Sequence, residues 1–422
     1  MTTVTLGTRL ELHVEAVAHG GFCVARHEGR AVFVRHALPG EDVIALVTED
    51  RGNYLRADAV EVLVASADRV VPPCEYARPG RCGGCDWQHA SRPAQLRLKA
   101  AVVHEQLQRL AGMERSVTVE DAGPADGLGW RTRVTFAVAA AGEPGFRKHR
   151  SHEIQPVDRC LIAHPLVEDI GIERRRWRGT ATVEAIVATG TGDAALVVAP
   201  VRPHDEIVVP PLDAKAAVLR GDDKGNAVPV RGRAGVREVA GGHTFRVSGS
   251  GFWQVHPAAA ETLTGAVLDM LEPGEGEFAL DLYAGVGLFA VALATALGPG
   301  GRVLAIESYA GATADAAYNT RDLATVQVET GKVERVLTTL GLKRCDIVVL
   351  DPPRKGAGAD VVRRIVALRP RAIAYVACDP ASLARDVATF GAAGYPLTRL
   401  RAFDLFPMTQ HVECVALLEP SP

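Results

Sequence analysis

The first 64 residues show a hydrophobic pattern of short strands separated by tight turns. Apolar and polar positions alternate in five runs, and every gap between two runs contains a glycine. The predicted strands are 8–17, 21–26, 31–34, 42–48 and 54–62. They predict a small, closed, OB-like β-barrel over 1–64, an architecture that often binds nucleic acid. The basic residues near its loops suit such binding, but they suit an ordinary solvated rim as well.

Residues 65–248 contain one strong helical pattern. Between about 90 and 112, apolar residues recur at helical spacing with Arg and Lys between them. Most of the remaining stretch has the pattern of strands and turns, for example at 134–138 and 194–199. We therefore expect a mostly β central domain over 65–248, whose helix at about 90–112 packs on the domain that follows.

From residue 249 onward, strands alternate with helices, which is typical of a parallel sheet covered by helices. The predicted strands include one that ends near 282, then 302–306, 346–350 and 372–377, and a last strand at 411–418. The pattern predicts a Rossmann-like α/β domain over 249–422.

A glycine-rich turn follows the first strand of this domain. Gly285 and Gly287 flank one residue, and an Ala-rich helix begins at about Leu288. Glycine lets the backbone approach a ligand closely, and a helix start offers free N–H groups. Glu307 and Asp351 follow two later strands, and ligands of open α/β sheets bind at such strand ends. The turn predicts a nucleotide-like cofactor, although a tight turn in any α/β domain would also explain it.

Composition limits the classes of function. The chain has 422 residues and a formal net charge of −3, so it has room for two or three domains and no global basic excess. Nucleic acid would have to bind local patches, such as the basic and aromatic residues between 130 and 150. We find no membrane-spanning run and no signal-peptide pattern, and we expect a cytoplasmic monomer without an obligate protein partner.

Four of the eight cysteines suggest a metal site. Cys74, Cys82 and Cys85 lie within 12 positions, and Cys160 is the fourth candidate ligand. Cytosolic cysteines are usually free, metal-bound or catalytic. The spacing itself leaves zinc and iron–sulfur open, because both accept four thiolates.

Cys378 and Glu413 are candidates for covalent chemistry on a pyrimidine. Pyrimidine C5 is a poor nucleophile until a thiolate adds to C6, and a base must later remove the C5 proton. Cys378 ends a predicted strand just before the helix start at Asp379-Pro380, where the helix dipole favours a thiolate. Glu413 lies near the start of the last strand and is the candidate base. Taken alone, each residue could equally be a buried thiol or a surface acid.

Five segments together resemble the RNA uracil-C5 methyltransferases, which form 5-methyluridine. They are SGFWQVHP (250–257), DLYAGVG (281–287), DPPRKGA (351–357), VACDPASLARD (376–386) and HVE (411–413). The resemblance extends over nearly the whole chain, since the N-terminal pattern is similar to the TRAM domain. It implies a class I S-adenosylmethionine (SAM) methyltransferase domain and an RNA substrate, with 23S ribosomal RNA favoured over transfer RNA.

The resemblance also implies roles for individual residues. Cys378 would be the nucleophile and Glu413 the base. The residues implied to contact SAM are Gln254, Tyr283, Gly285, Glu307 and Asp351. The ligands implied for a [4Fe–4S] cluster, now favoured over zinc, are Cys74, Cys82, Cys85 and Cys160.

Two residues depart from the family pattern. Leu288 stands where many members have an Asn near the cofactor, which puts that contact in doubt. Asp379 follows the nucleophile where Asn is usual, and its charge would raise the pKa of the thiol. Two other functions remain as alternatives: an NAD-dependent oxidoreductase, and a non-catalytic RNA-binding protein whose cluster senses oxidants.

Overall fold

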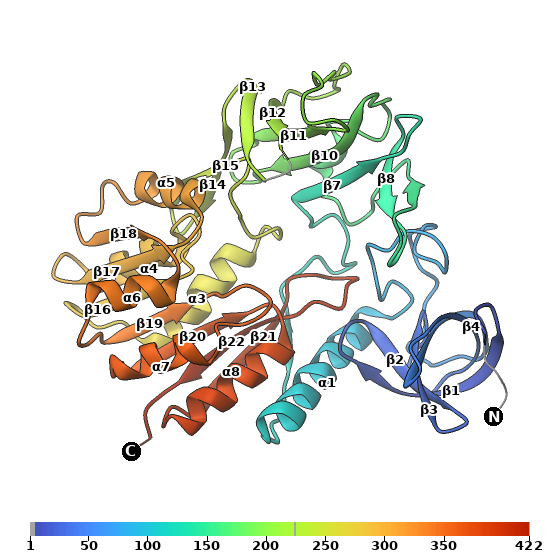
Figure 1. The fold of residues 1–422 in the computed structure, drawn as a ribbon, viewed down its shortest axis with the longest axis horizontal. Coiled ribbons are helices and arrows are strands. Elements are labelled where there is room, and N and C mark those ends of the chain that lie inside the picture. Colours follow the sequence, from blue (N-terminus) through green and yellow to red (C-terminus); the bar gives the residue numbers. More distant parts are fainter. Residues whose placement is uncertain (1–4, 223–224, 422) are drawn as a thin grey trace.

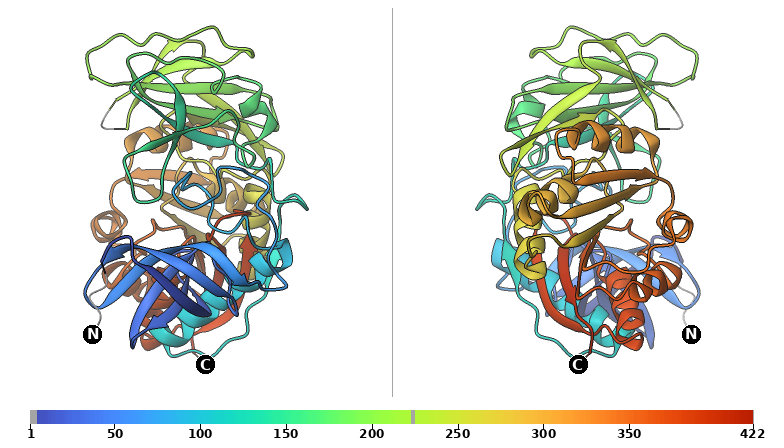
Figure 2. Two further views of the ribbon diagram at one scale, coloured as in Figure 1. Left: turned by 90° about the vertical axis from the view of Figure 1, so that its right-hand side faces the viewer. Right: turned by 90° about the vertical axis from the view of Figure 1, so that its left-hand side faces the viewer.

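The computed structural model describes residues 5–222 and 225–421. It contains a small N-terminal barrel, a central domain built on a β-sheet, and an α/β unit (Figure 1). The barrel and the central sheet lie at opposite ends of the molecule in Figure 2. The α/β unit contacts the central sheet through shared apolar side chains. It contacts the barrel through the hydrogen bond between His19 and Asp379. No helix in the described part of the chain has the length and apolarity needed to cross a bilayer.

The N-terminal barrel closes as the alternating pattern predicts. Its strands are β1 (Arg9–Ala18), β2 (Phe22–His27), β3 (Arg30–Arg35), β4 (Asp42–Asp50) and β5 (Tyr54–Val64), in the order β1-β2-β3-β5-β4. In β1, Leu10, Leu12 and Val14 are buried while the residues between them are exposed. This period of two directs one face of every strand into the barrel core.

The central sheet has seven strands in the order β13-β12-β11-β10-β7-β8-β9. They are β7 (Arg133–Val138), β8 (Pro144–Arg147), β9 (Ile154–Pro156), β10 (Thr180–Val187), β11 (Ala194–Pro200), β12 (Ala217–Gly221) and β13 (Ala227–Arg231). Phe136 and Trp177 are fully buried in its core, near the short helix α2 (Pro165–Glu168). A separate hairpin, β14 (Gly235–Ala240) and β15 (His243–Ser248), packs in a second apolar cluster, which joins the central sheet to the α/β unit.

The α/β unit is built on an eight-stranded sheet of order β18-β17-β16-β19-β20-β22-β21-β6. Its strands are β6 (Val119–Asp121), β16 (Phe278–Leu282), β17 (Arg302–Glu307), β18 (Val326–Thr330), β19 (Ile347–Leu350), β20 (Ala372–Ala377), β21 (Leu397–Asp404) and β22 (Glu413–Leu418). Its helices are α3 (Ala259–Leu271), α4 (Leu288–Leu297), α5 (Ala310–Asn319), α6 (Val333–Leu340), α7 (Ala359–Ala367) and α8 (Pro380–Ala392). Apolar clusters on both faces bury the inner strands.

The sheet is parallel from β18 to β20, as predicted, but its last strand is not. β22 pairs antiparallel with both β20 and β21. The reason is the connection: the segment 405–412 joins β21 to β22 as a hairpin, whereas a parallel pair needs a crossover of a dozen or more residues. This reversal brings the start of β22 to the same edge as the end of β20.

Residues from before the central sheet complete the α/β unit. Helix α1 (Arg92–Ala111) begins at Ser91, whose side chain caps Ala94 N–H, and ends at Gly112 in the left-handed conformation. It packs against α8, and β6 pairs with β21 as the edge strand of the sheet. The sequence pattern predicts the helix, but a three-residue strand is too short to give a periodic signal.

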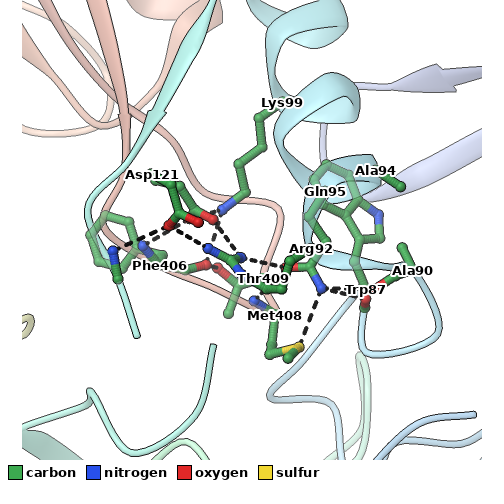
Figure 3. A network of polar contacts seen from close by, with 12 residues as sticks. Trp87, Ala90, Arg92, Ala94, Gln95, Lys99, Asp121, Phe406, Met408 and Thr409 are labelled. Carbon is green, nitrogen blue, oxygen red and sulfur yellow. Dashed lines mark hydrogen bonds and ion pairs between the residues drawn. The ribbon is translucent and has the colours of Figure 1, made fainter. Parts of the chain in front are cut away.

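A buried polar network fastens α1 to the end of β21. The Lys99 ammonium group is fully buried, bonded to the Asp404 carboxylate, and donates to Phe406 O at 3.0 Å. Arg92 joins them, with 2.7 Å hydrogen bonds to both Asp404 and Asp121 (Figure 3). Burial lowers the pKa of Lys99 to about 8, against the opposing effect of Asp404. The network satisfies charges that would otherwise be costly to bury.

Candidate active site

A cavity of about 990 Å³ opens at the carboxyl ends of the α/β strands. All seven residues predicted for catalysis and cofactor binding line it: Gln254, Tyr283, Gly285, Glu307, Asp351, Cys378 and Glu413. They come from segments up to 159 positions apart, between 254 and 413. We call this space the strand-end cavity, and the roles of its residues stay predictions at this point.

The sheet register places Cys378 opposite Glu413. β20 and β22 run antiparallel with Val376 against Val415 and Ala377 against Cys414. One step further along the same register, Cys378 faces Glu413. A thiol and a carboxyl group therefore share one end of the cavity, an arrangement that depends on the reversed last strand.

Burial disfavours the ionised form of both groups. Burial, followed by the nearby Glu413 and Asp351, raises the pKa of the Cys378 thiol to about 12. Burial also raises the pKa of Glu413 well above its usual range, and that of Asp351 to about 7. Arg354 opposes the shifts of Cys378 and Glu413. Desolvation therefore opposes the effect predicted for the helix start after Cys378, which is a favoured thiolate.

The glycine-rich turn and the end of β17 form the other side of the cavity. The Glu307 carboxylate accepts hydrogen bonds from Gly285 N–H at 3.1 Å and Tyr309 N–H at 2.7 Å. Tyr283 has a φ of 63°, a left-handed conformation that is uncommon for a tyrosine and frequent at functional turns. This local geometry fixes the backbone where a nucleotide-like ligand would approach.

Two further residues, Phe252 and Arg354, line the cavity but have no role in the sequence prediction. A third, Asp281, is fully buried, and its carboxyl group interacts with the charges of Asp351 and Glu307. Burial raises its pKa to about 8. Phe252 lines the cavity with 61% of its surface exposed, and Arg354 faces Cys378 and Glu413. All three lie inside the segments that resemble the family. The sequence could therefore have indicated that they belong near the site, but not which groups they contact.

Leu288, the first departure from the family pattern, lies outside the cavity lining. It is 8% exposed and packs with Val286 and Val291 in the apolar cluster beneath the β14–β15 hairpin. Its side chain therefore serves the packing between the α/β unit and the central domain.

The four predicted cysteine ligands line a second cavity of about 320 Å³. We call it the cysteine cavity; its lining includes Cys74, Cys82, Cys85 and Cys160, all of them free thiols. Within the described ranges, no three His, Cys, Asp or Glu side chains are placed to hold a metal ion.

Arg131 separates the two cavities. Its side chain lines both, and it is buried enough for desolvation to lower the pKa of the guanidinium. His411 lines the cysteine cavity, and its Nε2 lies 3.5 Å from Arg354 Nη2 of the strand-end cavity. The two sites are therefore neighbours in space.

Comparison with known proteins assigns the chain to a family. A TRAM domain model matches residues 3–60, and a model described as tRNA (Uracil-5-)-methyltransferase matches residues 236–421. A relative from Streptomyces avermitilis, described as an uncharacterized RNA methyltransferase, is 54% identical over 99% of both chains. A second such relative, from Streptomyces coelicolor, is 53% identical over 99% of this chain and 94% of its own.

One solved structure shares the fold over nearly the full length. The tRNA (uracil-54, C5)-methyltransferase of Pyrococcus abyssi, in complex with S-adenosyl-L-homocysteine, is 22% identical and superposes with a TM-score of 0.72. The match covers 97% of this chain and 100% of that one. This likeness shows a shared fold. The model that matches residues 236–421 and the full-length RNA methyltransferase relatives show that the chain belongs to the tRNA (uracil-5-)-methyltransferase family of RNA methyltransferases.

Proposed function

We propose that this RNA methyltransferase transfers the methyl group of SAM to C5 of a uridine in RNA through a covalent adduct between Cys378 and C6 of the base. The observation that carries the proposal is the placement of Cys378 opposite Glu413 within the strand-end cavity. A methyltransferase acting on an amine or a ribose hydroxyl needs no thiol at this point. A thiol facing a carboxyl group is what C5 chemistry requires.

The proposed reaction takes place in successive steps, in which each bond that forms is matched by one that breaks. The Cys378 thiolate adds to C6, and the electron pair of the C5–C6 bond becomes available at C5. C5 then forms a bond to the SAM methyl carbon while the bond from that carbon to sulfur breaks. The Glu413 carboxylate removes the remaining C5 proton, the double bond re-forms, and the thiolate leaves C6.

The cofactor side of the cavity suits SAM in shape and charge. Glu307 is the last residue of β17, a position where an acid accepts hydrogen bonds from ribose hydroxyls. Gly285 and Tyr283 form the turn at which the backbone approaches the ligand, while Gln254 and Asp351 line the same space.

A bound cofactor would also help to activate the nucleophile. SAM carries a cationic sulfonium, and a positive charge in this cavity lowers the pKa of nearby thiol and carboxyl groups. Arg354 acts in the same direction on Cys378 and Glu413. The ionised forms needed for catalysis are thus favoured when SAM is bound.

The RNA side of the proposal is supported by the exposed ring of Phe252. Enzymes that act on a base inside a folded nucleic acid flip it into a pocket, and aromatic side chains stack on unstacked bases. Phe252 is positioned for this at the rim of the strand-end cavity. We retain 23S ribosomal RNA as the first substrate to test, with transfer RNA as the second.

The test of the proposal is methyl transfer to undermodified RNA. Protein purified without oxygen would be incubated with methyl-labelled SAM and either ribosomal or transfer RNA lacking 5-methyluridine. We expect labelled 5-methyluridine in nucleosides from one of the two RNAs. Label in another nucleoside, or none despite bound SAM, would refute C5 methylation by this protein.

We further propose that the cysteine cavity holds a [4Fe–4S] cluster. Four thiols around one cavity provide the donor set that such a cluster requires, and burial raises the pKa of Cys160 to about 12, so without a metal this thiol stays protonated. The cluster would join segments around 74–85 and 160 and adjoin Arg131. It would act as a structural centre beside the reaction, not as a reactant.

Metal analysis would check the cluster directly. We expect about four iron atoms per chain and visible absorption from protein purified without oxygen. Cys82→Ala and Cys160→Ala should each lose iron, whereas Cys345→Ala, a buried cysteine of the α/β core, should retain it. One zinc per chain, or full iron content in both ligand variants, would contradict the assignment.

A further inference from the structure

The barrel touches the α/β unit directly beside the predicted nucleophile. His19 lies in the turn between β1 and β2, and its Nε2 is 3.1 Å from Oδ2 of Asp379. Asp379 immediately follows Cys378 and caps α8, with its Oδ1 accepting Ser382 N–H at 2.8 Å. A residue 360 positions away in the sequence therefore holds the carboxylate next to the thiol.

The turn between β1 and β2, which carries His19, packs closely against its neighbours. Gly20 and Gly21 have φ values of 96° and 81°, in the region that favours glycine. A Cβ on Gly21 would come within 3.0 Å of Asp86 Cγ and 3.1 Å of Gln410 Cβ. The turn thus lies between the cysteine-bearing segment and the hairpin segment 405–412, and it presents His19 to Asp379.

Asp379 is a potential obstacle to thiolate formation. The charged or titratable groups facing Cys378 are Glu413, Asp351, Arg354 and Asp379. Burial opposes ionisation of Asp379, but hydrogen bonds from His19 and Ser382 prevail and lower its pKa to about 2. Burial raises the pKa values of Glu413 and Asp351 instead, so among these three carboxyl groups the ionised form is most favoured for Asp379.

We propose that His19 is a positioning residue for methyl transfer: by engaging the Asp379 carboxylate, it limits the repulsion between that carboxylate and the Cys378 thiolate and seats the barrel against the active site. The inference rests on the proposed role of Cys378 as nucleophile. A carboxylate whose two oxygens are both hydrogen-bonded repels a neighbouring anion less than one facing it unpartnered. Removing His19 should therefore raise the pKa of the thiol, and removing the Asp379 charge should make His19 dispensable.

The experiment measures Cys378 itself. Wild type, His19→Ala, Asp379→Asn and the double variant would be alkylated with iodoacetamide across a range of pH, and the Cys378 peptide quantified by mass spectrometry. We expect His19→Ala to shift the alkylation profile upward by about half to one pH unit, which slows alkylation at neutral pH about three- to tenfold. Asp379→Asn, which still caps the helix, should show no further shift when His19 is also removed.

Controls distinguish an effect of His19 on the Cys378 thiol from a general effect of altering the barrel, and from failure of the proposed methyl transfer. His13→Ala removes an exposed barrel histidine that pairs with Asp42 at 2.7 Å, and it should leave the profile unchanged. An equal shift on removing His19 in the Asp379→Asn background, or no shift in His19→Ala, would overturn the inference. Because alkylation needs neither SAM nor RNA, the predicted shifts would support it even in a protein that failed to methylate uridine.

Discussion

Replacing Cys378 by alanine is expected to reduce methyl transfer by on the order of 10⁴-fold or more, which is a typical effect of removing a covalent nucleophile. Without the thiolate, nothing adds to C6, and C5 stays too weak a nucleophile to take the methyl group. Label transferred from SAM to RNA in single-turnover assays would measure the loss. Binding of SAM should change little, because Cys378 lies on the base-facing side of the proposed chemistry.

The matched control is Cys345→Ala. Cys345 is also a free thiol of the α/β unit, but it is buried in the apolar core and does not line the strand-end cavity. It should keep near wild-type methyl transfer. Undiminished transfer by the Cys378 variant would show that no C6 adduct forms and would redirect attention to a different target atom.

Changing Glu413 to glutamine is expected to trap the reaction after methyl transfer. The isosteric amide fits the same buried position but cannot remove the C5 proton, so the thiolate cannot leave. We expect turnover to fall by about 10²–10⁴-fold, the usual contribution of a general base. At the same time, a protein–RNA adduct should accumulate and survive denaturing electrophoresis.

The double variant Cys378→Ala, Glu413→Gln provides the control for this result. It should form no adduct, because the covalent bond requires the thiol. An adduct that persisted in the double variant would point to another nucleophile. Normal turnover without adduct in the Glu413→Gln protein would remove Glu413 from the role of base.

Much of the fold could be predicted because its signals are local. Alternation of period two marks the barrel strands, and their closure and the Rossmann-like α/β fold are both confirmed. The glycine-rich turn and the strand-end residues also follow from short segments. Membership in an RNA methyltransferase family then decides against both alternatives, the oxidoreductase and the non-catalytic cluster protein.

The rest depends on contacts that no local pattern encodes. Cys378 meets Glu413 only because the 405–412 segment reverses β22, and the periodicity of a buried strand is the same in either direction. The expectation that the helix dipole favours a thiolate left out burial, which raises the pKa of the Cys378 thiol. The pairing of His19 with Asp379 joins residues 360 positions apart, a distance beyond any sequence window.

The way α1 completes the α/β sheet has a consequence during synthesis on the ribosome. Lys99 finds its partner, Asp404, 305 residues later in the chain. At about 5–20 residues per second, this interval lasts roughly 15–60 s. The strands of the barrel are contiguous in the sequence, so the barrel can close early in that time. The apolar face of α1 stays exposed, and accessible to chaperones, until the last strands of the α/β sheet have been synthesised.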